Sequence, residues 1–262
     1  MVVHVPPIFY ATLPSLLMAG VLVVFETLRG GPARDGWRNL QIWAVEIAAS
    51  LAFLPCLPGW AGPGLIDTAR LPVWQGFLIF LVVRDGCECL FHYAQHRIPF
   101  LWAMHSLHHS DPNMGTLTTS RHFWADPLLK QMTIWAASLI IVSPTPTVFL
   151  LYGLASLWNF LTHAHLPIDF GRFSWLLNCP AYHRRHHSIL REHYDQNFAA
   201  ILPIFDVMLG TYRRPDGYPQ TGLERAPCSL GEVLIWPLIW DKPRRAAIAP
   251  AEALPSNPHL QP

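Results

Sequence analysis

Histidines at chelating intervals are the residues of this sequence most suited to chemistry. Of the 14 histidines, 11 lie between His92 and His187. Side chains four residues apart share one face of a helix. In H-x-x-H-H the first and second histidines are expected to share a face, while the third is turned by about 100° and can reach a second ion. Such groups can hold two ions between them. Four groups have this character: His92-x-x-x-His96, His105-x-x-His108-His109, His163-x-His165 and His183-x-x-His186-His187.

Nitrogen ligands narrow the choice of metal. Neutral imidazole suits iron, zinc, copper or nickel, whereas calcium and magnesium prefer oxygen. A lone histidine is more often a hydrogen-bonded core residue than a ligand, and His4 and His259 are interpreted in this way. The roles of His165 and His193 stay open. The five cysteines have no C-x-x-C spacing, which favours neither disulfides nor a thiolate site.

The elements that must position these histidines are predicted to be membrane helices. The chain is 52% hydrophobic and 13% charged, against about a quarter charged in an ordinary soluble domain. Apolar runs at 8–28, 39–58 and from Leu71 predict three spans. The run at 128–163 is broken by SPTPT and predicts a short helical hairpin bent at Pro144 and Pro146. The expected fold is therefore all-α, with about four transmembrane segments.

Charge placement predicts the orientation of those segments. Arginines lie between the first two spans and downstream of the last, and basic loops stay cytoplasmic. The N-terminus is then expected outside, with the first span retained and the histidines on the cytoplasmic side. Residues 230–240 are too short to span and are expected at the interface, and the tail from Pro250 is expected to be disordered. A net charge of +1 argues against nucleic acid as a partner.

The flanking residues carry a resemblance to a known family. From about residue 75 to 215 the chain resembles the fatty acid hydroxylase and sterol desaturase superfamily of membrane di-iron oxygenases. The resemblance divides the chain into N-terminal helices (1–74), a catalytic domain (75–215) and a C-terminal segment (216–262). The matching stretches are DGCECLFHYAQH (85–96), PFLWAMHSLHHS (99–110), TTSRH (118–122), WNFLTHAH (158–165), CPAYHRRHHS (179–188) and YDQNFAAILPIFDVMLGTY (194–212).

The resemblance also implies which residues form the site. Asp85, Asp195 and Asn197 would be outer partners that orient imidazoles. Tyr93, His165 and Ala199 differ from the residues that the family commonly has at these positions. The register around His122 also differs, and the role of His122 stays open. The metal ligands would be His92, His96, His105, His108, His109, His163, His183, His186 and His187.

The implied reaction is oxidation of a C–H bond in a lipid-like substrate: fatty acyl, sterol or hopanoid, sphingoid or carotenoid. This chemistry needs a redox-active metal, so two iron ions are expected, with zinc only as a substitute. No nucleotide, haem or iron–sulfur motif occurs, which implies a separate cytochrome or ferredoxin donor besides membrane lipids. The alternative is a histidine-rich metal-binding or transport protein. Hydroxylation and desaturation remain open, as does the oligomeric state.

Overall fold

The protein is described by a computed structural model over residues 7–31, 36–57 and 63–240, and nearly all the regular elements of these residues are helices, joined by loops. The expected tail from Pro250 lies outside the described residues. The helices of six or more residues are α1 (Pro7–Leu28), α2 (Gly36–Phe53), α3 (Val73–Arg97), α4 (Pro99–His109), α6 (Ala136–Ile141), α7 (Pro146–Ser156), α8 (Trp158–His163), α9 (Pro180–His186) and α10 (Ile204–Leu209). The shorter elements are η1 (Leu54–Cys56), β1 (Ile66–Asp67), η2 (Thr68–Arg70), η3 (Thr116–Ser120), α5 (Asp126–Lys130), η4 (Gln131–Trp135), β2 (Val142–Ser143), η5 (Gly171–Phe173), η6 (Arg191–His193), α11 (Leu230–Leu234) and α12 (Trp236–Ile239).

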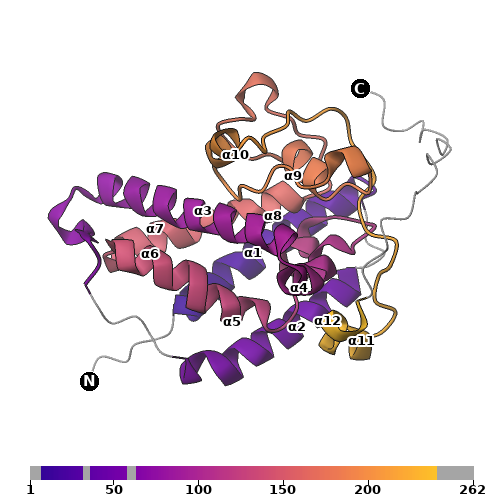
Figure 1. Cartoon of the computed structure of the whole chain (residues 1–262), viewed down its shortest axis with the longest axis horizontal. Coiled ribbons are helices and arrows are strands. Elements are labelled where there is room, and N and C mark those ends of the chain that lie inside the picture. Colours follow the sequence, from indigo (N-terminus) through magenta and orange to yellow (C-terminus); the bar gives the residue numbers. More distant parts are fainter. Residues whose placement is uncertain (1–6, 32–35, 58–62, 241–262) are drawn as a thin grey trace.

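Helix α3 is the long central element, and the others pack around it. In Figure 1 it runs along the long axis, with α9 and α10 above it and α2, α11 and α12 below. Its contacts include α4, α6 and α7. Phe80 on α3 is fully buried and forms one hydrophobic cluster with Val142, Val148 and Tyr152. This cluster holds the first half of α3, while the second half carries the first two histidines of the site.

A proline separates α3 from α4 and sets the angle between them. Pro99 lacks a backbone N–H and restricts the residue before it to extended conformations. Ile98 adopts φ −93° and ψ 117° and ends α3. Pro99 then occupies the first turn of α4, where its missing N–H costs nothing. The turn folds α4 back against α3, so that histidines from both helices face each other.

The chain also reverses between α6 and α7. Val142 and Ser143 form a two-residue parallel pairing with Ile66 and Asp67. The Thr68 hydroxyl fixes this turn, because it donates to the Ser143 carbonyl (3.1 Å) and accepts from the Thr145 N–H (2.8 Å). Helix α7 then begins with Pro146 in its first turn. The returning chain, through α7 and α8, brings His163 back to the α4 end of α3.

Residues 230–240, which the sequence predicted at a bilayer interface, carry one tryptophan into the protein interior. Trp236 is fully buried in a cluster with Ile42, Met104 and Leu107. Its indole N–H donates to the Ser106 hydroxyl at 2.9 Å. Helix α11 therefore packs against α2 and helix α12 against α4. The polar end of the indole has its hydrogen-bond partner inside the protein.

The prediction of an integral membrane protein is wrong for this structure. Over 7–31, 36–57 and 63–240, none of the helices is at once long enough and apolar enough to cross a bilayer. Helix α3 has Arg84, Asp85 and Glu88 in its interior, and charges are costly in hydrocarbon. The run at 128–163 is divided among several short helices. The four predicted spans, and the cytoplasmic orientation derived from them, are therefore wrong.

Candidate metal centre

Four helices deliver imidazoles to one place beside the α3–α4 turn. The side chains come from two pairs of helices, α3 with α4 and α8 with α9, and the members of each pair are in contact. Imidazoles join the two pairs, because His163 lies beside His108 and His186 lies beside His92. Every predicted ligand is among them, and each ring is buried or nearly so. The structure therefore brings together the nine histidines that the sequence singled out. They form two groups, with His92, His96, His105, His109 and His186 in the first and His108, His163, His183 and His187 in the second.

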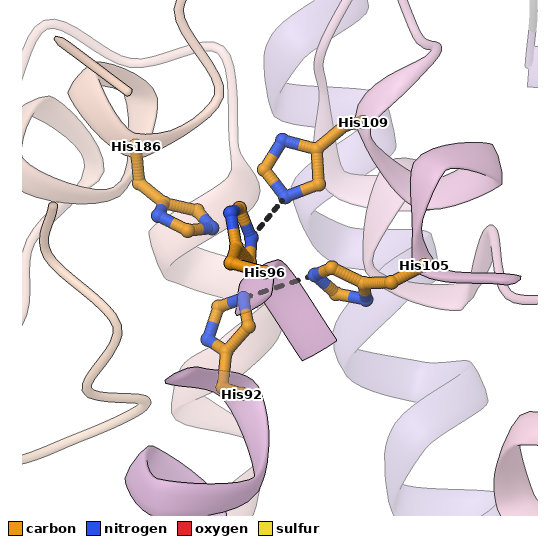
Figure 2. A group of neighbouring side chains, drawn as sticks. All are labelled: His92, His96, His105, His109 and His186. Atoms are coloured by element: carbon orange, nitrogen blue, oxygen red, sulfur yellow. Dashed lines mark hydrogen bonds between the residues drawn. The ribbon is translucent and has the colours of Figure 1, made fainter. Parts of the chain in front are cut away.

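The group of five histidines draws its rings from three helices. Figure 2 shows these five imidazoles pointing toward one another around a common centre. The ligand atoms within this group all lie within 4.8 Å of one another. The Nε2 atoms of His92 and His105 are 3.0 Å apart, and those of His96 and His109 are 3.2 Å apart. Two nitrogens at right angles around an ion bound at about 2.1 Å would be about 3.0 Å apart, so the spacing fits a shared ion.

The Nε2 atoms in the group of four histidines have the same spacing. His163 Nε2 lies 3.2 Å from His108 Nε2 and 2.9 Å from His183 Nε2. His187 Nε2 lies 3.2 Å from His183 Nε2. The two groups meet where the ring of His187 stacks on that of His109, with centroids 4.3 Å apart. Two ions held in these groups would therefore be neighbours.

Several imidazole rings contact a backbone carbonyl through Nδ1, the ring nitrogen that faces away from the other histidines. The Nδ1 atoms of His92 and His186 lie 2.7 Å from the carbonyl oxygens of Phe198 and Gln196. On the other group, His163 Nδ1 lies 2.7 Å from the carbonyl of Asn159. An Nδ1–H that donates to a carbonyl leaves Nε2 as the free acceptor and fixes the ring angle. These contacts prepare Nε2 to bind a metal.

The segment that supplies two of those carbonyls has an unusual backbone. Asp195 and Asn197 adopt φ of 59° and 60°, in the left-handed region. Asparagine and aspartate tolerate this region better than other residues with side chains. The Asn197 side chain accepts from the Arg213 N–H (2.7 Å) and donates to the Arg213 carbonyl (3.0 Å). Asn197 thus holds the backbone that faces the histidines.

Asp206 fixes the same segment from behind and was not identified from the sequence. Its carboxylate is fully buried. One oxygen accepts the Phe198 N–H (2.8 Å) and the Thr211 hydroxyl (2.6 Å). The other accepts the Ala199 N–H (2.7 Å) and the Tyr182 hydroxyl (2.5 Å). The signal in the sequence was only a carboxylate in an apolar stretch, which does not reveal its partners.

The other two predicted outer partners have different roles. Asp195 Oδ1 lies 3.5 Å from His96 Nδ1, so this carboxylate faces an imidazole. Asp85 instead accepts the backbone N–H groups of Ile201 (3.0 Å) and Leu202 (2.8 Å). Asp85 therefore anchors the chain just after the carbonyls that hold the rings.

Burial controls the protonation of the site. It lowers the pKa of all nine imidazoles, and neighbouring imidazoles lower the pKa of most of them further. The pKa values of His163 and His186 fall to about 4, although carbonyl contacts oppose the shift. At neutral pH the rings are therefore uncharged, which is the form that binds a metal.

Three histidines with open roles lie outside both groups. The ring of His122 stacks on that of His108, with centroids 4.5 Å apart, and its Nδ1 lies 3.3 Å from Asp126. His165 instead faces Tyr218, and His193 lies 3.9 Å from Asp216. His122 alone of the three therefore contacts a predicted ligand.

Known proteins are similar to this chain in sequence over much of its length. A family model described as fatty acid hydroxylase matches residues 77–211. The alkylglycerol monooxygenase of Xenopus tropicalis is 30% identical over 238 residues, 85% of this chain and 52% of that protein. The enzyme of that name from Danio rerio is 31% identical over 212 residues, 78% of this chain and 45% of its own length. The ornithine lipid hydroxylase OlsE of Rhizobium tropici is 27% identical over 135 residues, 52% and 41% of the two chains. The chain thus spans about half the length of these relatives, and no solved structure matches it.

Proposed function

The chain belongs to the fatty acid hydroxylase family, and on that basis we propose that it is an oxygenase that hydroxylates a lipid with two iron ions. The observation that carries the proposal is the division of nine buried histidines into neighbouring groups of five and four. One group would serve one metal, and two would account for every predicted ligand. A site for a single ion would leave at least four buried imidazoles without a purpose.

The donor set fits iron. The nitrogens within each group are spaced as ligands of one ion, and burial keeps the rings neutral. Borderline imidazole nitrogen binds iron, zinc and copper alike, and oxidation of a C–H bond requires a metal that changes its redox state. When bound, two iron ions would supply the electrons and the binding site through which dioxygen is activated.

The residues of the chain contribute geometry and exclude water. His92 and His186 are held by carbonyls of the 196–198 segment, and His163 by the first turn of α8. Fixed rings keep two ions at a constant separation, and preorganisation of this kind is what a two-metal reaction needs. Burial of the rings keeps solvent away from the reacting atoms.

A hydroxylation fixes the number of oxygen atoms, protons and electrons that the reaction uses. One oxygen atom enters a C–H bond to give an alcohol, and the other leaves as water, which consumes two protons and two external electrons. We propose a separate donor protein with an acidic docking face. Arg191, Arg213 and Arg214 are exposed and suit such a partner. Arg184 and Arg185 are only 7% and 8% exposed and do not belong to that surface.

The names of the relatives favour hydroxylation over desaturation. They are alkylglycerol monooxygenases and an ornithine lipid hydroxylase, and each name describes insertion of oxygen into a lipid. We therefore propose a lipid with an alkyl chain as substrate. The earlier sterol, hopanoid and carotenoid possibilities receive no comparable support from these names.

The test is product formation by the full chain with iron, a reducing system and ¹⁸O₂. Total lipid extract serves as substrate, and products are compared by mass spectrometry. The expected product is heavier by one ¹⁸O atom. The matched control replaces His186 with alanine, which removes one imidazole from the group of five histidines. A product two mass units lighter than its substrate would show desaturation, and absence of any product at full iron occupancy would refute the proposal.

A further inference from the structure

His122 lies outside both histidine groups, yet its ring covers a proposed metal ligand. It is placed between η3 and α5. Its ring stacks on that of His108, with centroids 4.5 Å apart and an angle of 11° between the ring planes. The ring of His105 is also close to parallel with it, at 6.4 Å and 26°. His122 therefore lies flat against one face of the His108 ring.

The ring of His108 needs a support of this kind. Its Nδ1 atom is buried and has no hydrogen-bond partner among the residues that the structure describes. The torsion that turns an imidazole about its Cβ–Cγ bond is broad, so the backbone does not fix the direction of Nε2. In His92, His163 and His186 a backbone carbonyl fixes that direction through Nδ1. The angle of the His108 ring depends instead on the rings packed against it.

Most of the rings packed against His108 are themselves proposed ligands. They include His163 and His187, whose centroids lie 5.0 and 4.6 Å from that of His108. These two rings belong to the same group of four histidines, so they do not hold His108 independently of the ion. Among the described rings, His122 is the neighbour of His108 that approaches from outside the site.

His122 is itself held in place by a buried carboxylate. Its Nδ1 atom lies 3.3 Å from Oδ2 of Asp126, which is only 1% exposed. The same oxygen lies 3.2 Å from Lys130 Nζ, and Oδ1 accepts the side-chain N–H of Gln95 at 2.8 Å. Gln95 belongs to α3, the helix that carries the first two proposed ligands. The position of His122 is thus tied to the framework of the site.

We propose that His122 is a positioning residue that holds the His108 ring, by stacking, with Nε2 directed at the ion in the group of four histidines. This inference rests on the proposed function, which places an ion there. Outer partners that orient a metal ligand typically raise metal affinity about 10–100-fold. The effect belongs chiefly to the group of four, because His122 lies nearer to His108 than to His105.

The experiment titrates the full-length protein, freed of metal, with Co²⁺. The visible absorption spectrum reports the ligand geometry of each bound ion, and wild type is expected to bind two ions per chain. His122→Leu fills a similar volume without a flat ring, so the affinity for one ion should fall about tenfold and its spectrum should change. His122→Phe also loses the contact with Asp126 but keeps a flat ring, so it should recover most of that affinity.

Variants of the ligands assign the affected ion to a histidine group. His183→Ala removes a ligand from the group of four and should abolish the spectral component that weakens in His122→Leu. His186→Ala removes a ligand from the group of five and should leave that component in place. The opposite assignment would overturn the inference.

His193→Ala is the matched control. His193 is also buried and faces a carboxylate, at 3.9 Å from Asp216, but it belongs to neither group. This variant should bind both cobalt ions like wild type, and urea unfolding of the metal-free variants checks that each is folded.

Three results would contradict the inference. Wild-type cobalt binding in His122→Leu would show that His108 needs no outer support. Equal losses in His122→Leu and His122→Phe would show that ring stacking is not the cause, and equal weakening of both ions would show a general structural role. Wild-type protein that binds fewer than two cobalt ions would instead refute the proposed two-metal site, whatever His122 does.

Discussion

Asp206→Asn should destabilise this protein far more than its conservative chemistry suggests. The substitution keeps the size of the side chain and removes one acceptor oxygen. In the wild type, two backbone N–H groups and two hydroxyls converge on the carboxylate at 2.5–2.8 Å. An asparagine can satisfy only one of the backbone N–H groups with its oxygen, and its NH₂ then faces the other.

The cost follows from those contacts. A hydroxyl can rotate to accept from the new NH₂, but a backbone N–H cannot, so one buried donor loses its partner at about 1–3 kcal/mol. The remaining bonds lose their charged acceptor, at about 1 kcal/mol each. The free energy of unfolding should therefore fall by roughly 3–5 kcal/mol. Iron occupancy should fall as well, because the same segment presents the Phe198 carbonyl to His92.

The assay is urea unfolding followed by tryptophan fluorescence, with iron content measured in the purified protein. Asp169→Asn is the control, because that exposed carboxylate accepts a single backbone N–H, from Gly171 at 2.8 Å. It should cost less than about 1 kcal/mol and leave iron content unchanged. If both variants lose the same small amount of stability, the reasoning that Asp206 organises the 197–199 backbone is refuted.

Other outcomes are expected on the same physical grounds. His186→Ala should lower iron per chain and abolish turnover, whereas His193→Ala, outside both groups, should do neither; equal iron in both would remove His186 from the ligand set. Gly64→Ala places a Cβ 2.5 Å from the Ser143 backbone nitrogen, and should lower the melting temperature without changing iron per folded chain. In metal-free protein the depressed histidine pKa values mean that the unfolded state takes up protons first as pH falls. The free energy of unfolding should therefore decrease from about pH 6.5 to 4, because nine histidines outnumber the buried carboxyls whose raised pKa values act in the opposite direction, namely Glu26, Glu46, Asp85 and Asp126. A flat or rising profile in urea titrations would contradict this assignment.

The sequence alone did not predict correctly what surrounds the helices. Apolar runs predicted membrane spans, yet none of the described helices meets the length and apolarity that crossing requires. Composition averages over a helix and does not show which residues face a neighbour. Trp236, predicted at an interface, is buried against α4. Only packing decides whether an apolar side chain faces lipid, solvent or another helix.

Spacing along the chain determined which histidines can share a helix face, because that follows from the period of the helix. It did not determine how they divide. Adjacent residues His108 and His109 belong to different groups, as do His186 and His187, and the partners come from helices more than 50 residues apart. The outer contacts were equally hidden, since the Phe198 and Gln196 carbonyls carry no side-chain signature. A carbonyl can hold a ring only where tertiary contacts from Asn197 and Asp206 fix the direction of the backbone.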